Sequence, residues 1–258
     1  MPIALITGAS AGLGAEFARQ LAAAGYDLVL VARDAARLEQ LAGTLPVRSE
    51  VLAADLLDPE GLARVEARLA QVADPVDYLI NNAGFGTHYE LDESAVDDES
   101  RQLTLLATVP LRLSHAALTQ MLPRRSGRVL TVASVAGFAP LGTYSAAKAW
   151  ALTFSRWANA YYRTSGVAFS AVAPGFVRTE FHERMGVTRE ATAPAFAWLE
   201  AGPVVRAALR AVERRRPVSV PSLRYRALIA VLPLAMPFVR SAVARKGSTR
   251  RAKLAARA

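Results

Sequence analysis

Short apolar, β-rich runs alternate with longer stretches of helical composition along residues 1–220, and this alternation constrains the fold more than any other feature. Strands separated by helices of this length are typical of β-α-β units, which build a parallel sheet. The strand centres, such as residues 28–31 and 78–80, are continuously apolar, as expected for strands covered on both faces. The pattern predicts a single doubly wound α/β domain with about seven parallel strands. The expected strands are residues 3–7, 27–32, 50–54, 76–81, 128–133, 167–173 and 217–220. The expected helices lie near residues 13–24, 34–43, 59–73, 99–122, 144–164 and 203–215.

Composition excludes several classes of protein. The chain has 258 residues, of which 52% are hydrophobic and 21% charged, so it has a sizeable core and is not disordered. It contains no cysteine, which excludes a disulfide scaffold, a thiolate metal site and a cysteine nucleophile, and is compatible with the cytoplasm. The three histidines, His88, His115 and His182, do not follow a metal-ligand spacing, so we expect no metal site.

The net charge of +9 is confined to the C-terminal end. Residues 222–258 carry nine basic side chains and no acidic one, whereas residues 1–221 carry 22 of each sign. We therefore expect a neutral domain over residues 1–221 followed by a basic, partly apolar extension over 222–258. Because a neutral domain offers no extended basic face, nucleic acid is not an expected partner.

Neither end of the chain resembles an export signal or a membrane span. The first apolar run is short, lacks a basic region before it and meets Gly8 at once, so we expect no signal peptide. The longest apolar stretch is 227–239, and it contains Pro233 and Pro237. A helix needs about 20 residues to cross a bilayer, so this shorter stretch is expected not to span one. Two interpretations remain: an anchor lying on anionic lipid, or a helix packed on the body with a frayed basic end.

A glycine-rich turn follows the first expected strand. Its sequence is Thr7-Gly8-Ala9-Ser10-Ala11-Gly12-Leu13-Gly14, and a helical stretch begins directly after it. Glycines at such a turn let the backbone approach a pyrophosphate, which then lies at the positive end of the helix. The spacing G-x3-G-x-G differs from the general dinucleotide fingerprint, and a tight turn that needs glycine is the alternative explanation.

Four further motifs follow this turn in a fixed order along residues 7–179. They are Asn81-Asn82-Ala83-Gly84, Ser134, Tyr144-x3-Lys148 and Pro174-Gly175-x3-Thr179. In this order the motifs resemble those of the short-chain dehydrogenase/reductase family, and the match extends from the N-terminus to about Val220. The resemblance implies a Rossmann-type fold and an NAD(P)-dependent oxidoreductase that acts on CH–OH or C=O groups of a small molecule. It is also compatible with a homo-oligomer.

Tyr144 and Lys148 are the expected centre of catalysis. They are four residues apart on an expected helix, so their side chains share one face. Transfer of a proton to a carbonyl oxygen near neutral pH is expected to need a phenol of lowered pKa, and a neighbouring ammonium lowers it. Lys148 is the only lysine in residues 1–221, against twenty-one arginines, which favours a specific role over an exposed helix pair. Ser134 closes a strand at the carboxyl edge, where the family positions a serine to bind the substrate oxygen.

The end of the second strand predicts the preferred cofactor. Ala32 stands where NAD users of the family usually carry an acid, and Arg33 follows it. Arginine suits the 2′-phosphate of NADP, so we expect NADPH to be preferred; the alternative is that Arg33 is a solvated surface charge. Asp34 is expected to cap the next helix. By resemblance Asp55 contacts the adenine, although it could equally be a turn residue. The other residues that the resemblance assigns to the cofactor are Gly8, Ser10, Gly12, Leu13, Gly14, Asn81, Ala83, Gly84, Tyr144, Lys148, Pro174, Gly175, Val177 and Thr179.

Two departures from the family pattern support a rival function. Ser134 and Tyr144 are ten residues apart, about three fewer than is usual, although loops tolerate deletion. Leu106 stands where the family commonly has a catalytic asparagine, and leucine has no polar group to hold the relay water between lysine and solvent. The rival is a cofactor-binding sensor or scaffold with little turnover.

Residues 176–200 are expected to close over the substrate. They include Phe176, Phe181, Met185, Phe196, Trp198 and Leu199. These side chains favour a lipophilic ketone or alcohol, or they simply pack the segment onto the body. The sequence as a whole predicts an NADPH-dependent reductase, cytoplasmic with membrane association left open.

Overall fold

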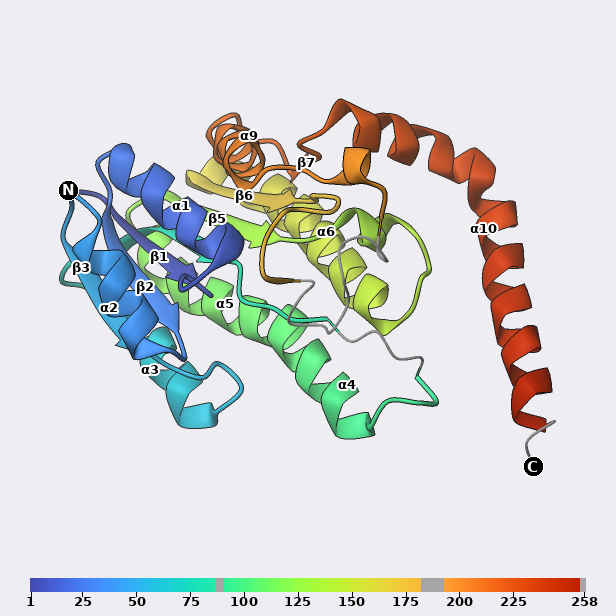
Figure 1. Cartoon of the computed structure of the whole chain (residues 1–258). Coiled ribbons are helices and arrows are strands. Elements are labelled where there is room, and N and C mark those ends of the chain that lie inside the picture. Colours follow the sequence, from blue (N-terminus) through green and yellow to red (C-terminus); the bar gives the residue numbers. More distant parts are fainter. Residues whose placement is uncertain (87–90, 182–192, 256–258) are drawn as a thin grey trace.

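The computed structural model describes residues 1–86, 91–181 and 193–255, and at its centre is a seven-stranded parallel sheet (Figure 1). The strands are β1 (Ile3–Thr7), β2 (Asp27–Ala32), β3 (Ser49–Ala53), β4 (Val76–Asn81), β5 (Gly127–Val132), β6 (Val167–Val172) and β7 (Val218–Ser219). Their order in the sheet is β3-β2-β1-β4-β5-β6-β7. Each predicted strand is present, with bounds that differ by at most one residue, and the doubly wound fold is confirmed. The order reverses between β1 and β4, and such folds bind ligands beyond the carboxyl ends of the strands at that point.

Helices cover both faces of the sheet because its strands are apolar on both sides. In β1, Ala4 and Ile6 pack into one core, and Ile3 and Leu5 into the other. The first core is closed by α1 (Gly12–Ala23), α2 (Ala35–Gly43) and α9 (Ala201–Glu213). The second is closed by α3 (Pro59–Ala70), α5 (Val109–Met121) and α6 (Thr143–Tyr161).

Aspartates begin two of these helices. The amide of Arg37 donates to Asp34 Oδ1 at 3.0 Å, so the predicted cap of α2 is confirmed. The amide of Gly61 donates to Asp58 Oδ2 at 2.9 Å at the start of α3. Each carboxylate satisfies an amide that the first turn of the helix leaves unpaired.

The helix predicted over residues 99–122 is present but contains a π-helical turn. The structure has α4 (Val96–Leu103), a π-helical turn over Thr104–Thr108, and then α5. Pro110 lies just after this turn and has no amide hydrogen to donate to the carbonyl of Leu106, its partner four residues back in an α-helix. The wider turn accommodates the missing hydrogen bond.

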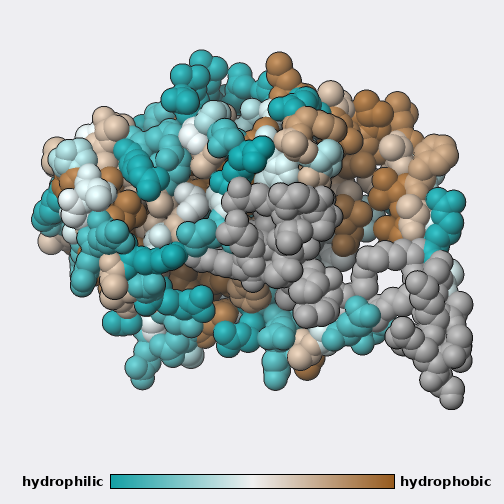
Figure 2. Space-filling model, viewed as in Figure 1, coloured by the Kyte–Doolittle hydropathy of each residue, from teal (hydrophilic) through white to brown (hydrophobic). Residues whose placement is uncertain are grey.

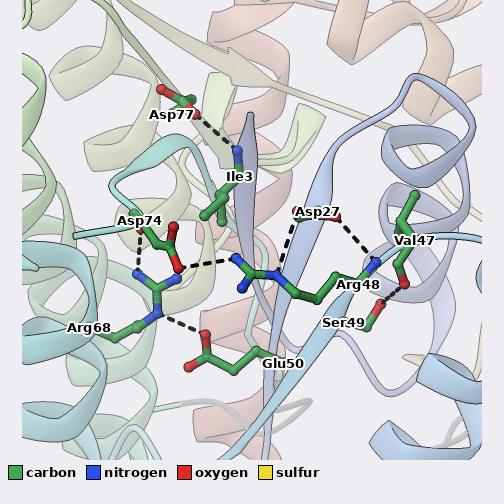
Figure 3. Close-up of polar contacts among 9 residues, drawn as sticks. All are labelled: Ile3, Asp27, Val47, Arg48, Ser49, Glu50, Arg68, Asp74 and Asp77. Carbon is green, nitrogen blue, oxygen red and sulfur yellow. Dashed lines mark hydrogen bonds and ion pairs between the residues drawn. The ribbon is translucent and has the colours of Figure 1, made fainter. Parts of the chain in front are cut away.

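A polar network ties together the amino ends of the strands, opposite the ligand-binding edge (Figure 3). Arg68, which is buried, donates from Nε to Glu50 Oε2 at 2.9 Å and from a terminal nitrogen to the carbonyl of Asp74 at 3.1 Å. Arg48 bridges Asp74 and Asp27 on the other side of the same network. These contacts fix β2, β3, α3 and the segment before β4 relative to one another.

The C-terminal extension forms one long helix, α10 (Leu223–Ala255), which leaves the body and runs down one side of the molecule (Figure 1). Pro233 and Pro237 lie inside it, and the helix bends along its length rather than ending. We expected the apolar stretch to be too short to span a bilayer, and this is wrong, because the helix continues beyond that stretch. By length and composition alone, Leu223–Arg245 could cross a membrane. The first turn of the helix packs on the body, where Tyr225 is buried, and Ile229, Leu232 and Met236 further along are partly buried.

Candidate active site

The glycine turn between β1 and α1 has the form of a phosphate cradle. Gly8 and Gly12 have φ angles of 65° and 55°, in the region that favours glycine. A side chain at Gly14 would place its Cβ 2.0 Å from the carbonyl oxygen of Gly8, so the turn closes only with glycine there. The first turn of α1 has no acidic residue and no side-chain cap. Its amides therefore face the carboxyl edge of the sheet, where they fit a pyrophosphate.

Thr7 joins this turn to the loop that follows β4. Its hydroxyl accepts hydrogen bonds from the amides of Asn82 and Ala83, both at 3.0 Å. The amide group of Asn82 donates back to the carbonyls of Thr7 and Gly8, at 2.9 and 3.2 Å. Thr7 and Asn82 are functional residues that were not predicted from the sequence beyond their place in the motifs. The signal was available, because both are polar residues at the ends of neighbouring strands.

Asn81 is buried at the end of β4. Its amide nitrogen donates to Ser114 Oγ at 3.3 Å, and its Oδ1 has no hydrogen-bond partner among the described residues. An orphaned buried acceptor at this edge fits a site that receives a polar ligand.

Ser134, Tyr144 and Lys148 converge at the carboxyl end of β5. Ser134 lies close enough to Tyr144 for its side chain to lower the pKa of the phenol. Lys148 Nζ lies 5.6 Å from the centroid of the Tyr144 ring and donates to the carbonyl oxygen of Val132 at 2.7 Å. Ser134 Oγ also accepts from the amide of Ala136 at 3.1 Å, which fixes the serine. The shortened loop after Ser134 thus allows the two side chains to meet.

Burial sets the pKa values of this group. It raises the pKa of Tyr144 to about 12, although the nearby Ser134 side chain acts to lower it. It lowers the pKa of Lys148 to about 8, because the ammonium loses its hydration. The expectation that the pKa of Tyr144 is lowered is wrong for the protein without cofactor. Desolvation of the phenol raises the pKa more than Ser134 lowers it.

Leu106 and Lys148 both lie close to Gly84. A Cβ on Gly84 would be 2.8 Å from Leu106 Cδ2 and 4.0 Å from Lys148 Nζ. The leucine side chain is buried and adds an apolar group to this neighbourhood of the lysine. Leu106 belongs to the π-helical turn, which lies just before Pro110.

The segment after β6 reaches from the serine to the glycine turn. The carbonyl of Pro174 accepts from the amide of Val135 at 3.0 Å. Val177 is buried and pairs with Leu199 in an isolated bridge, and a Cβ on Gly12 would be 3.2 Å from Thr179 Cβ. Of these three predicted residues, Thr179 is the one that these contacts place beside the cradle.

The residues expected to contact the adenosine part of the cofactor lie at the ends of β2 and β3, and Arg33 among them is exposed. Arg33 is exposed at the end of β2 and makes no ion pair within the part of the chain that the structure describes. Ser10 borders a hollow of about 310 Å³ together with Arg37, which pairs with Glu180 at 3.1 Å. Asp55 accepts from the amide of Leu57 at 3.0 Å and so acts locally as a turn residue. Leu13 is partly buried against the first core.

Aromatic side chains border the substrate side. The ring of Phe181 lies 6.4 Å from that of Tyr144, and the rings of Phe176 and Trp198 are 5.5 Å apart. Trp198 is buried, whereas Phe196 is exposed. Within the described part of this segment, Trp198 thus packs on the body and Phe181 lies beside Tyr144. Met185 lies outside the described residues.

Comparison with known proteins identifies the family. A model described as short chain dehydrogenase matches residues 2–190. The chain belongs to the short-chain dehydrogenase/reductase family. It is accordingly an NAD(P)-dependent oxidoreductase that acts on CH–OH or C=O groups. Groups of three or more side chains suited to a metal do not occur within residues 1–86, 91–181 and 193–255.

Two curated relatives match 69% of the chain. Dehydrogenase/reductase SDR family member 7B of Mus musculus is 30% identical over 187 residues, which cover 69% of this chain and 58% of the relative. The 3-oxoacyl-[acyl-carrier-protein] reductase FabG of Escherichia coli is 33% identical over 183 residues, which cover 69% of this chain and 74% of FabG. The chain thus spans little more than half the length of the mouse relative.

Two solved structures of the family match most of the chain. A short-chain dehydrogenase from Sphingobium yanoikuyae in complex with NADPH has a TM-score of 0.82 and 37% identity, over 93% of this chain and 96% of that chain. A bulky-bulky ketone specific alcohol dehydrogenase from Comamonas testosteroni has a TM-score of 0.77 and 33% identity, over 93% and 94%.

Proposed function

We propose that the protein is an NADPH-dependent reductase of bulky, lipophilic ketones, which also oxidises the corresponding alcohols. The observation that carries this proposal is the convergence of Ser134, Tyr144 and Lys148 beside a glycine cradle. When bound, the cofactor supplies a hydride to the carbonyl carbon. The residues that would hold it are those of the cradle, the loop after β4 and the segment from Pro174 to Thr179.

Tyr144 donates the proton that the reduced carbonyl oxygen needs. A pKa of about 12 keeps its phenol protonated at neutral pH, which is the form required for donation. Ser134 donates a hydrogen bond to the same carbonyl oxygen and holds it near the phenol. Lys148 is charged below its pKa of about 8, and its positive charge favours the phenolate left after the transfer.

Preference for NADPH rests on Arg33. The guanidinium is exposed at the strand end where the adenosine ribose lies in doubly wound folds, and a 2′-phosphate there would gain a charge-assisted hydrogen bond. The NADPH-bound Sphingobium neighbour supports the assignment. Replacement of Arg33 by Ser should raise the Kd for NADPH at least tenfold and leave that for NADH nearly unchanged. Arg163→Ser, which removes an exposed arginine elsewhere, is the control. Equal losses for both cofactors would contradict the assignment.

The substrate class rests on the aromatic border. Phe181 lies beside Tyr144, so a ketone that reaches the phenol contacts an apolar ring. The Comamonas neighbour, which is specific for bulky-bulky ketones, supports a substrate with large groups on both sides of the carbonyl.

The test is NADPH oxidation with a panel of long-chain, polycyclic and small methyl ketones. Tyr144→Phe should lower kcat/KM by a hundredfold or more, the usual scale of a general acid. Tyr161→Phe, which alters an exposed tyrosine on the same helix, should leave it unchanged. If wild type binds NADPH but reduces no ketone faster than Tyr144→Phe, the sensor function replaces this proposal. Leu106 near Lys148 is the observation in favour of that rival.

A further inference from the structure

Helix α10 exposes an apolar surface that a soluble body ordinarily buries. Leu228, Val231, Leu234 and Phe238 are all exposed and recur at helical spacing on one side of it. In Figure 2 the hydrophobic colour gathers at the upper right, over the first half of α10. Contiguous exposed apolar surface of this kind marks an interaction site.

The charges around this surface indicate its partner. Arg226 and Arg240 bracket the apolar residues 227–239, and residues 222–258 contain no acidic side chain. An apolar element flanked by basic residues complements a bilayer with anionic head groups, because the apolar side chains enter the acyl boundary while the cations remain among the head groups. A second copy of the chain fits less well, since pairing of two α10 helices in either direction brings basic segments together.

The first turn of α10 is joined to the substrate side of the site. The hydroxyl of Tyr225 donates to the carbonyl of Ala197 at 2.9 Å and accepts from the amide of Phe176 at 3.3 Å. Its ring lies so close to Gly175 that a Cβ there would be 2.0 Å from it. Arg224 adds a hydrogen bond to the carbonyl of Phe196. The first turn of the helix is therefore fixed to residues 175–176 and 196–197.

From these contacts we infer that α10 binds an anionic lipid bilayer through the Leu228–Val231–Leu234–Phe238 surface and holds the substrate side of the site next to the lipid. A lipophilic substrate would then reach Tyr144 from the membrane rather than from water. The binding itself does not rest on the proposed reductase activity.

The first experiment is co-sedimentation of the full-length protein with two kinds of vesicle. One is phosphatidylcholine alone, and the other contains about one third phosphatidylglycerol. Binding should be stronger to the anionic vesicles and should weaken as salt is added. Each basic residue near an anionic surface contributes about fivefold to binding. Arg240→Gln should therefore lower the partition coefficient about fivefold on anionic vesicles only.

Two matched double variants separate the apolar surface of α10 from general hydrophobicity. Leu234→Ser/Phe238→Ser removes side chains that are 79% and 76% exposed. Val72→Ser/Val96→Ser removes side chains that are 79% and 75% exposed on other parts of the molecule. The first should reduce vesicle binding more than tenfold, because the transfer of each apolar side chain is lost. The second should leave it unchanged, and both should fold, since none of the four side chains is buried.

The absence of cysteine allows a direct readout of contact with lipid. A polarity-sensitive fluorophore attached at Phe238→Cys should shift to the blue when phosphatidylglycerol vesicles are added, and one attached at Val72→Cys should not. Equal sedimentation of the two double variants, or no shift at position 238, would overturn the inference. It would also be overturned if wild type were a dimer that ignores vesicles and Leu234→Ser/Phe238→Ser were a monomer, because a second copy would then cover the surface.

Discussion

The buried charge of Lys148 should make the protein less stable at neutral pH than a variant that lacks it. Its pKa falls from an ordinary 10.5 to about 8 because the folded chain removes the ammonium from water. At about 1.36 kcal/mol per pH unit, a shift of this size destabilises the folded state by about 3 kcal/mol below pH 8. Lys148→Met removes the charge and retains a stem of similar shape. It also removes the hydrogen bond to the carbonyl of Val132, which contributes about 1 kcal/mol at any pH.

The pH dependence separates these two effects. For a group whose pKa is lowered by folding, the unfolded chain binds more protons between the two pKa values, so stability rises with pH across pH 8 to 10.5. The gain of Lys148→Met over wild type should therefore shrink by about 2.5 kcal/mol between pH 7 and pH 10. Urea unfolding of both proteins at the two pH values measures this double difference, and Arg163→Met, at an exposed site, should show none. A difference between wild type and Lys148→Met that is the same at pH 7 and pH 10 would refute the lowered pKa.

Three further outcomes are expected. Gly175→Ala should lower Tm in thermal unfolding by about 4–8 °C, because the added Cβ overlaps the ring of Tyr225. Gly43→Ala, whose Cβ meets nothing within 4 Å, should leave Tm unchanged. Similar shifts for both variants would contradict the contact between Gly175 and Tyr225. Arg68→Met should lower the free energy of unfolding, measured by urea denaturation, by about 1–3 kcal/mol, since two hydrogen bonds of a buried guanidinium are lost. An unchanged value would show that the network does not stabilise the fold. For ketone reduction, kcat/KM should be constant below about pH 8 and fall above it as Lys148 loses its proton; a profile flat to pH 10 would exclude that role for the lysine.

Most of the fold follows from local pattern. The strands could be predicted because continuous apolar runs bounded by turn residues have few other structures available. The π-helical turn inside the helix predicted over residues 99–122 could not be predicted from composition. The effect of Pro110 on the turn before it depends on how α5 packs against α3 and β4. The length of α10 could not be predicted from the sequence pattern either, because two prolines ordinarily end a helix within a soluble domain.

Those site residues that lie at the carboxyl edge of the sheet could be predicted from the sequence. Ser134, Tyr144 and Lys148 meet there because the strand end and one helix face determine their places. The pKa of Tyr144 was predicted in the wrong direction, since sequence shows a neighbouring charge but not the extent of burial. Tyr225 was missed as a contact of Gly175 because the two lie far apart along the chain and no motif links them.

The reductase account is tested most directly by following a deuterium atom. Wild type would be incubated in a single turnover with NADPH that carries deuterium on the transferred position of the nicotinamide and with the best ketone of the panel. The account predicts an alcohol with deuterium on its carbinol carbon, formed by wild type and Tyr161→Phe and lost in Tyr144→Phe. Tight binding of NADPH with no deuterium in any product from wild type would contradict it.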